Sequence, residues 1–145
     1  MHLSRGSCYF ANEMRDDLNI IPEGGERVLL RGLEAFGPFA RLPAAGGVNR
    51  LAFFASGKHL DGRENVARAV LAAFAQGAME SSAAGESSAV IVSLAFDFVA
   101  DAKACECIEA HVKVVRRTRS LIFLTADLTV GGRILLTANG LAKRD

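Results

Sequence analysis

Four side chains of metal-binding type alternate along one stretch of the chain: Cys105, Cys107, Glu109 and His111. On a strand all four would share one face. Side chains two residues apart would then lie about 6.7 Å from each other, which is too far for easy joint ligation of one ion. The sequence also has no pair of cysteines with two residues between them, the spacing typical of zinc sites. We therefore expect no metal site.

A second group of reactive side chains lies in residues 57–62, a glycine-bounded break that contains Lys58, His59 and Asp61. A carboxylate beside a helix can act as a base or nucleophile, but aspartates at such positions are also common turn and capping residues. A single loop histidine is more often structural or solvated than catalytic. A polar strip with spacings in multiples of four follows the break: Glu64, Arg68, Gln76 and Glu80. Residue types alone leave both interpretations of these groups open.

The hydrophobic pattern predicts the elements that must position these groups. Residues 64–84 are dense in alanine and apolar on nearly every side, which is typical of a buried helix. Apolar and β-branched residues predict strands over the segments 39–42, 48–56, 88–99, 106–115, 121–130 and 133–142. The Gly131-Gly132 pair between the last two is a hairpin signal. We expect a short helix over 23–34 and a weakly structured leader over 1–22.

A helix buried on every side requires a sheet that curls around it. We therefore predict that residues 23–145 form one α+β domain, a curved antiparallel sheet wrapped around a long central helix, which is the hotdog fold. Alternate apolar side chains from Val90 to Phe98 are expected to face its core. The chain has 145 residues, of which 50% are hydrophobic, and this is enough to bury a core without disulfides or metal ions.

Charge and apolar run lengths exclude several partners. The 17 Lys and Arg residues nearly balance the 16 Asp and Glu residues, so the net charge of +1 gives no electrostatic support for nucleic-acid binding. No apolar run approaches the roughly 20 residues that span a bilayer, and the start shows no signal-peptide pattern. We therefore expect a cytoplasmic protein without a membrane partner, in which Cys8, Cys105 and Cys107 are free thiols.

Several segments together carry a resemblance to a known family. They are His59-Leu-Asp61-Gly-Arg-Glu64-Asn-Val66-Ala67-Arg68-Ala69, Phe98-Val-Ala-Asp-Ala102, Val114-Val-Arg-Arg-Thr-Arg-Ser-Leu121 and the hairpin at Gly131-Gly-Arg133. These segments, within residues 35–145, resemble hotdog-fold acyl-CoA thioesterases of the phenylacetate-degradation type. The family's His-Gly-Gly is replaced by residues 67–69, its helix carboxylate by Gln76 and its loop asparagine by Asp61. Residues 61–66 are also similar to the D-x-x-G-x-V motif of the 4-hydroxybenzoyl-CoA thioesterase type.

The resemblance implies a thioester hydrolase whose carboxylate, Asp61, attacks the carbonyl or activates water. Gln76 would orient the water or the acyl carbonyl. The backbone around Val66, Ala67, Arg68 and Ala69 would supply oxyanion donors, and His59 and Glu80 would lie on the substrate side. Arg68 would pair with Glu64 or lower the pKa of Asp61.

The resemblance also implies coenzyme A as part of the substrate and no separate cofactor. Arg116, Arg117 and Arg119 would bind its phosphates, with Lys58 and Arg63 as secondary contacts. The site would lie between the subunits of a homodimer or a dimer of dimers. The three arginines are also explained by a solvated strand end.

Two alternatives to thioester hydrolysis remain. The first is a non-catalytic hotdog protein that binds acyl-CoA or another apolar ligand, because the His-Gly-Gly motif and the helix carboxylate are lost. The second is a hydratase or dehydratase built on the same fold. It ranks last, because such enzymes usually carry an Asp/His pair in the site, and we do not expect His59 and Asp61 to form one.

Overall fold

The computed structural model describes residues 20–84 and 88–144. Its elements are β1 (Glu26–Val28), the 3-10 helix η1 (Glu34–Phe36), β2 (Phe39–Ala45), β3 (Val48–Phe54), the 3-10 helix η2 (Gly57–His59), α2 (Arg68–Ala84), β4 (Ala89–Phe98), β5 (Cys107–Arg117), β6 (Leu121–Val130) and β7 (Arg133–Arg144). The predicted leader lies outside the described residues up to position 19. None of the helices in the described part is long and apolar enough to cross a membrane.

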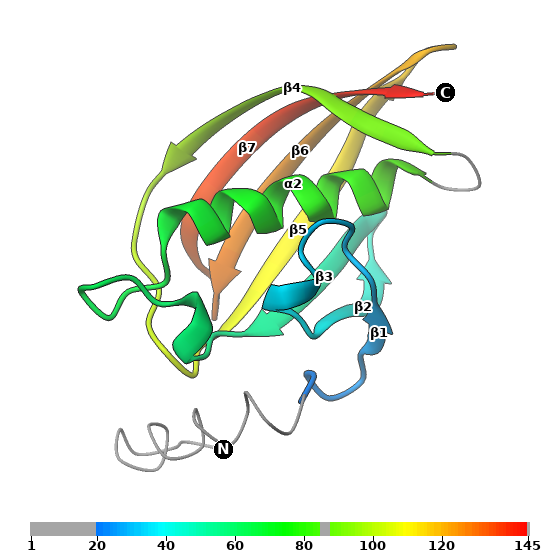
Figure 1. Cartoon of the computed structure of the whole chain (residues 1–145). Coiled ribbons are helices and arrows are strands. Elements are labelled where there is room, and N and C mark those ends of the chain that lie inside the picture. Colours follow the sequence, from blue (N-terminus) through cyan, green and yellow to red (C-terminus); the bar gives the residue numbers. More distant parts are fainter. Residues whose placement is uncertain (1–19, 85–87, 145) are drawn as a thin grey trace.

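The strands form one antiparallel sheet in the order β1-β2-β3-β5-β6-β7-β4. The sheet curves around α2, which lies across its concave face (Figure 1). The predicted α+β architecture, a curved antiparallel sheet around one long helix, is therefore confirmed. β1 and β4 are the two edges of the sheet, at opposite sides of the helix.

The predicted helix over residues 23–34 is wrong. Gly24 and Gly32 have φ values of 80° and 85°, which end a right-handed helix at both positions. Gly25 passes so close to β2 that a Cβ there would lie 2.8 Å from Ala40 Cβ. The segment therefore pairs with β2 as the short strand β1, and only η1 is helical.

One side of α2 packs on the sheet and the other does not. Its fully buried side chains are Leu71, Phe74, Ala75, Ala78, Met79 and Ala83. The approach to β7 is close, because a Cβ on Gly140 would lie 3.0 Å from Met79 Sδ. Arg68, Ala69 and Gln76 are exposed. The expectation that α2 is buried all round is therefore wrong for this single chain, because the sheet covers one side of the helix only.

The core-facing assignment of alternate residues in β4 is confirmed for Leu94 and Phe96, which pack against the core, and is wrong for Val90, Val92 and Phe98. Val90 is 51% exposed, Val92 is 55% exposed and Phe98 is 39% exposed. The pairing of β4 with β7 shifts by one residue between Ile91 and Ser93. Such a bulge moves the following side chains to the other face, so no simple alternation runs through the strand. In β5 the alternation is regular, since its side chains at 108, 110 and 112 are buried and those between them are not.

Candidate functional site

His59 is buried and has a structural role: it connects two segments of the chain and does not face a ligand site. Its side chain is 2% exposed and packs against Phe53, with ring centroids 4.7 Å apart. Ser56 N–H donates to Nδ1 at 2.9 Å, so Nδ1 is an acceptor and the proton is on Nε2. Nε2 donates to the Phe36 carbonyl at 2.8 Å. His59 therefore ties η2 to η1, and the ring cannot also serve as the acid or base of a hydratase pair.

Asp61 organises the loop before α2. Its Oδ1 accepts the backbone N–H groups of Arg63 at 2.8 Å and Asn65 at 3.1 Å. Its backbone N–H donates to the Asn65 carbonyl at 2.7 Å. Glu64 has a φ of 63° in this turn, which excludes it from a right-handed helix, so α2 begins at Arg68 and not at the predicted residue 64. The carboxylate is exposed and has the turn role that such aspartates commonly take.

The N-terminus of α2 offers fewer free donors than the sequence suggests. Val66 N–H donates to the Ala102 carbonyl at 2.8 Å, and Ala67 N–H donates to the His59 carbonyl at 2.9 Å. Ala67 precedes the helix, and its carbonyl accepts the first helical hydrogen bonds, from Val70 and Leu71. An alanine has no side-chain acceptor for the next N–H groups.

The backbone N–H groups of Arg68 and Ala69 remain available as hydrogen-bond donors. Neither group has an acceptor within residues 20–84 and 88–144. The first turn of a helix carries partial positive charge, so these two groups form a ready oxyanion site. Of the four residues expected to supply oxyanion donors, Val66 and Ala67 thus use their N–H groups within the fold, whereas Arg68 and Ala69 do not.

A carboxylate that the sequence analysis did not single out lies at the same place. Asp101 follows β4, and its Oδ1 lies 4.0 Å from Arg68 Nε. The Arg68 guanidinium also lies 5.2 Å above the centre of the Phe98 ring. Arg68 therefore pairs with Asp101, a partner that the sequence analysis did not name. Both partners are about half exposed, so the pair positions the side chains more than it stabilises the fold.

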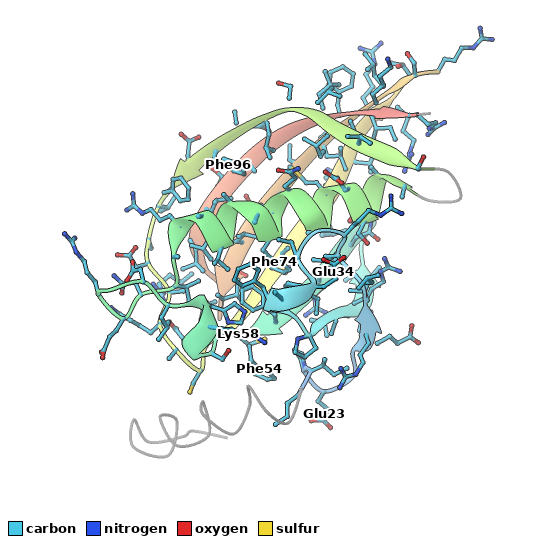
Figure 2. All side chains as sticks on the ribbon, in the orientation of Figure 1. Glu23, Glu34, Phe54, Lys58, Phe74 and Phe96 are labelled. Carbon is cyan, nitrogen blue, oxygen red and sulfur yellow. The ribbon has the colours of Figure 1, made fainter. Side chains whose placement is uncertain are left out.

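An apolar pocket of about 140 Å³ opens beside Ala69. Its walls come from α2, η1, the residue before η1 and β2: Leu33, Phe36, Phe39, Ala69, Val70, Ala73 and Phe74. The Phe39 and Phe74 rings stack at 5.6 Å with an interplanar angle of 11°. Figure 2 shows Phe74 between α2 and η1, the turn that carries Glu34. The pocket is thus an apolar cavity that ends at the residue with a free N–H.

Glu34 helps to hold η1 against this pocket. Its Oε1 accepts Gly32 N–H at 3.2 Å. Backbone hydrogen bonds, first its own N–H and then that of Gly32, lower the pKa of the Glu34 carboxyl below its ordinary value. The charged form of Glu34 is therefore the form that fits η1.

Gln76 and Glu80 lie on the uncovered face of α2, away from Asp61. Gln76 Nε2 donates to Glu80 Oε1 at 3.1 Å, a pair one turn apart on the helix. Glu80 lines a different, more polar groove together with Ser81 and Ala84. Within one chain these two residues do not reach the oxyanion donors, which lie two or more turns nearer the helix start.

Arg116, Arg117 and Arg119 lie at the far end of the sheet from the helix start. β5 begins at Cys107 beside Phe54 and runs to Arg117, ten residues later, a length of about 34 Å. All three arginines are exposed. Lys58 and Arg63 lie nearer the helix start, and Lys58 donates to the Gly37 carbonyl. The expected arginine contact with coenzyme A therefore needs a second subunit.

The cysteines differ from the expectation of three free thiols. Cys105 is disulfide-bonded, whereas Cys107 is a thiol, and Cys8 lies outside the described residues. Local sequence does not reveal such a bond, because pairing depends on which sulfurs the fold brings together. No group of three metal-binding side chains is close enough to hold an ion in the described part of the chain. The cytoplasmic location stays a prediction from the sequence.

Solved structures with this architecture share little sequence with the chain. A mutant of the phenylacetic acid degradation protein of Thermus thermophilus matches with a TM-score of 0.71 and 23% identity, over 78% of this chain and 97% of that one. Zebra fish thioesterase superfamily member 2 matches at 0.67 and 19%, over 74% and 81%. A hypothetical thioesterase of Streptococcus pneumoniae, solved with coenzyme A, matches at 0.66 and 13%, over 74% and 85%.

The chain has the hotdog fold. Its resemblance to hotdog thioesterases is thereby confirmed at the level of the fold. Identities this low leave the activity to be argued from the residues of the site. A scan against models of known families finds no match, and neither does a comparison with curated proteins.

Proposed function

We propose that this protein hydrolyses the thioester of an acyl or aromatic acyl group linked to coenzyme A. The observation that carries the proposal is the pair of unpaired N–H groups on Arg68 and Ala69, at the edge of an apolar pocket. A thioester needs both features, because its carbonyl oxygen gains negative charge during hydrolysis and its acyl group is apolar. Thioesterases among the structures with the same fold support the proposal.

The reaction is assigned to water and one carboxylate. Asp61, or Asp101 beside Arg68, takes a proton from water while the oxygen bonds to the carbonyl carbon. The carbon–sulfur bond then breaks, and the proton passes from the carboxyl group to the departing thiolate. Arg68 and Ala69 stabilise the intermediate oxyanion through their backbone N–H groups. Gln76 on its exposed helix face is proposed to contribute from the partner subunit.

A homodimer completes the proposed site. β4 is a ten-residue edge strand with exposed side chains at Val90, Val92 and Phe98, and Val99 directly after it is exposed too. Long edge strands with apolar side chains invite pairing with a second chain. Pairing there would cover the open face of α2 and bring the partner's arginines toward the first subunit's helix start. A dimer of such dimers is the larger assembly consistent with the proposal.

The test is a thiol-release assay on short, long and aromatic acyl-CoAs, with three variants compared. Asp61→Asn keeps an oxygen for the two N–H groups of its turn but removes the base. Asp101→Asn removes the other carboxylate, and Asp127→Asn on the outer face of β6 is the matched control. We expect activity from the wild type and the control, and a loss of about 100-fold in one of the first two. Full activity in all variants would reject both carboxylates.

A binding protein without catalysis is the second candidate. Two observations favour it: Oδ1 of Asp61 is already held by the turn, and Gln76 pairs with Glu80. The expected result in that case is thermal stabilisation of the folded protein by acyl-CoA with no thiol released from any member of the panel. Turnover that Asp61→Asn or Asp101→Asn abolishes would reject this candidate.

A further inference from the structure

Two leucines press on the middle of α2 at its only glycine, Gly77. A Cβ at this position would lie 3.0 Å from Leu33 Cδ1 and 3.3 Å from Leu30 Cδ1. The helix backbone does not require a glycine at this position, and glycine is less favourable than alanine inside a helix. Its effect is to let the two leucine side chains approach the helix backbone.

This contact separates two hollows on the same side of α2. The apolar pocket beside the helix start is lined by Ala69, Val70 and Ala73, one turn before Gly77. A larger groove of about 500 Å³ is lined by Gly77 itself and by Glu80, Ser81 and Ala84 after it. Leu33 lines the first hollow and Leu30 lines the second. The two side chains therefore lie against Gly77 between the two hollows, a position that we call the partition.

We infer that Leu33 determines the length of the acyl group that this protein accepts. The inference rests on the proposed function, since it assigns the first pocket to the acyl group. At about 140 Å³ the pocket is close to the cavity size that holds one benzene ring. A short or single-ring acyl group fits it, and a longer chain meets the Leu33 side chain. Removing that side chain takes away the part of the partition that lines the pocket and opens the pocket toward the groove, whose wall includes the apolar residues Val28 and Leu29.

The effect on affinity follows from the number of methylene groups that leave water. Each buried methylene raises affinity by a factor of about four. Two methylenes that enter the opened channel would therefore raise it more than tenfold. A four-carbon chain ends within the first pocket, and its affinity should change little.

The experiment measures binding by isothermal titration of thioether analogues of butyryl-CoA and dodecanoyl-CoA, which cannot be hydrolysed. Leu33→Ala is compared with the wild type and with Leu141→Ala, a matched leucine on β7 that lines neither hollow. Leu33→Val shortens the same side chain less severely, for use if Leu33→Ala does not fold. Gly77→Ala adds a methyl group to the partition and should keep the preference for the short chain.

We expect the ratio of dodecanoyl to butyryl affinity to rise at least tenfold in Leu33→Ala, more modestly in Leu33→Val, and not at all in Leu141→Ala or Gly77→Ala. Binding of both analogues with an unchanged ratio in a folded Leu33 variant would overturn the partition and leave the proposed function intact. Absence of binding by the wild type would overturn the proposed function, and the partition with it.

Discussion

Replacing Arg68 by proline removes one of the two free N–H groups at the start of α2 while keeping the helix. Residue 68 is the first residue of α2, where a missing N–H breaks no helical hydrogen bond and the fixed φ of proline suits the helix. Loss of one oxyanion donor costs about 100- to 1,000-fold in kcat. Because the Ala69 N–H remains, we expect Arg68→Pro to lie at the lower end, with kcat reduced about 100-fold.

The control for this prediction is Arg68→Ala, which retains the N–H and loses only the guanidinium. That change removes a half-exposed ion pair with Asp101 at 4.0 Å and the contact with Phe98, so its effect on stability should stay below about 1 kcal/mol. Steady-state thiol release gives kcat for both variants, and urea unfolding followed by far-UV circular dichroism gives their stability. Equal kcat in two folded variants would refute the role of the residue 68 N–H as an oxyanion donor.

Three further predictions concern the surroundings of the site. His59→Ala should lower the free energy of unfolding by about 3–5 kcal/mol in chemical denaturation. The change opens a cavity and leaves Ser56 N–H and the Phe36 carbonyl unpaired. A loss under about 1 kcal/mol would contradict the role of His59 in tying η2 to η1. The lowered pKa of Glu34 means that its stabilising contribution is present above its unfolded pKa and is lost as the pH falls through the folded pKa. Unfolding measured against pH should show this loss in the wild type and not in Glu34→Gln, so identical profiles would contradict it. Val92→Lys places a charge on the β4 edge and should convert the proposed dimer to a monomer in light scattering, an outcome refuted by an unchanged mass.

The chain's local patterns were enough to predict most elements of the fold. The many alanines over residues 68–84 indicate a helix, and the alternation of apolar side chains in β5 indicates a strand. The helical repeat of about 3.6 residues and the strand repeat of two involve only side chains that are close in sequence. The hairpin between β6 and β7 was equally local, because Gly131 and Gly132 adopt φ values of 55° and 87° that other residues rarely accept. The curled sheet then followed from the need to bury the helix.

The candidate site depended on contacts between segments far apart in the chain. Ala102 takes the N–H of Val66, and Asp101 is thereby placed beside Arg68, although some 35 residues separate the partners. The only signal in the sequence was a carboxylate after a long strand, which does not say what lies next to it. The bulge in β4 and the position of Glu64 were likewise decided by pairing partners that a local pattern does not contain.

The sequence by itself therefore determined the class of fold, the long helix and the strands, because these follow from short-range periodicity and turn chemistry. Tertiary structure alone decided which backbone N–H groups at α2 are already used, which carboxylate stands beside Arg68, and where Leu33 closes the pocket against Gly77. Each of these depends on hydrogen-bond partners and side-chain volumes brought together by folding. Local residue preferences do not reveal them, since the N–H group or side chain of the same residue can be hydrogen-bonded or free according to what the rest of the chain places beside it.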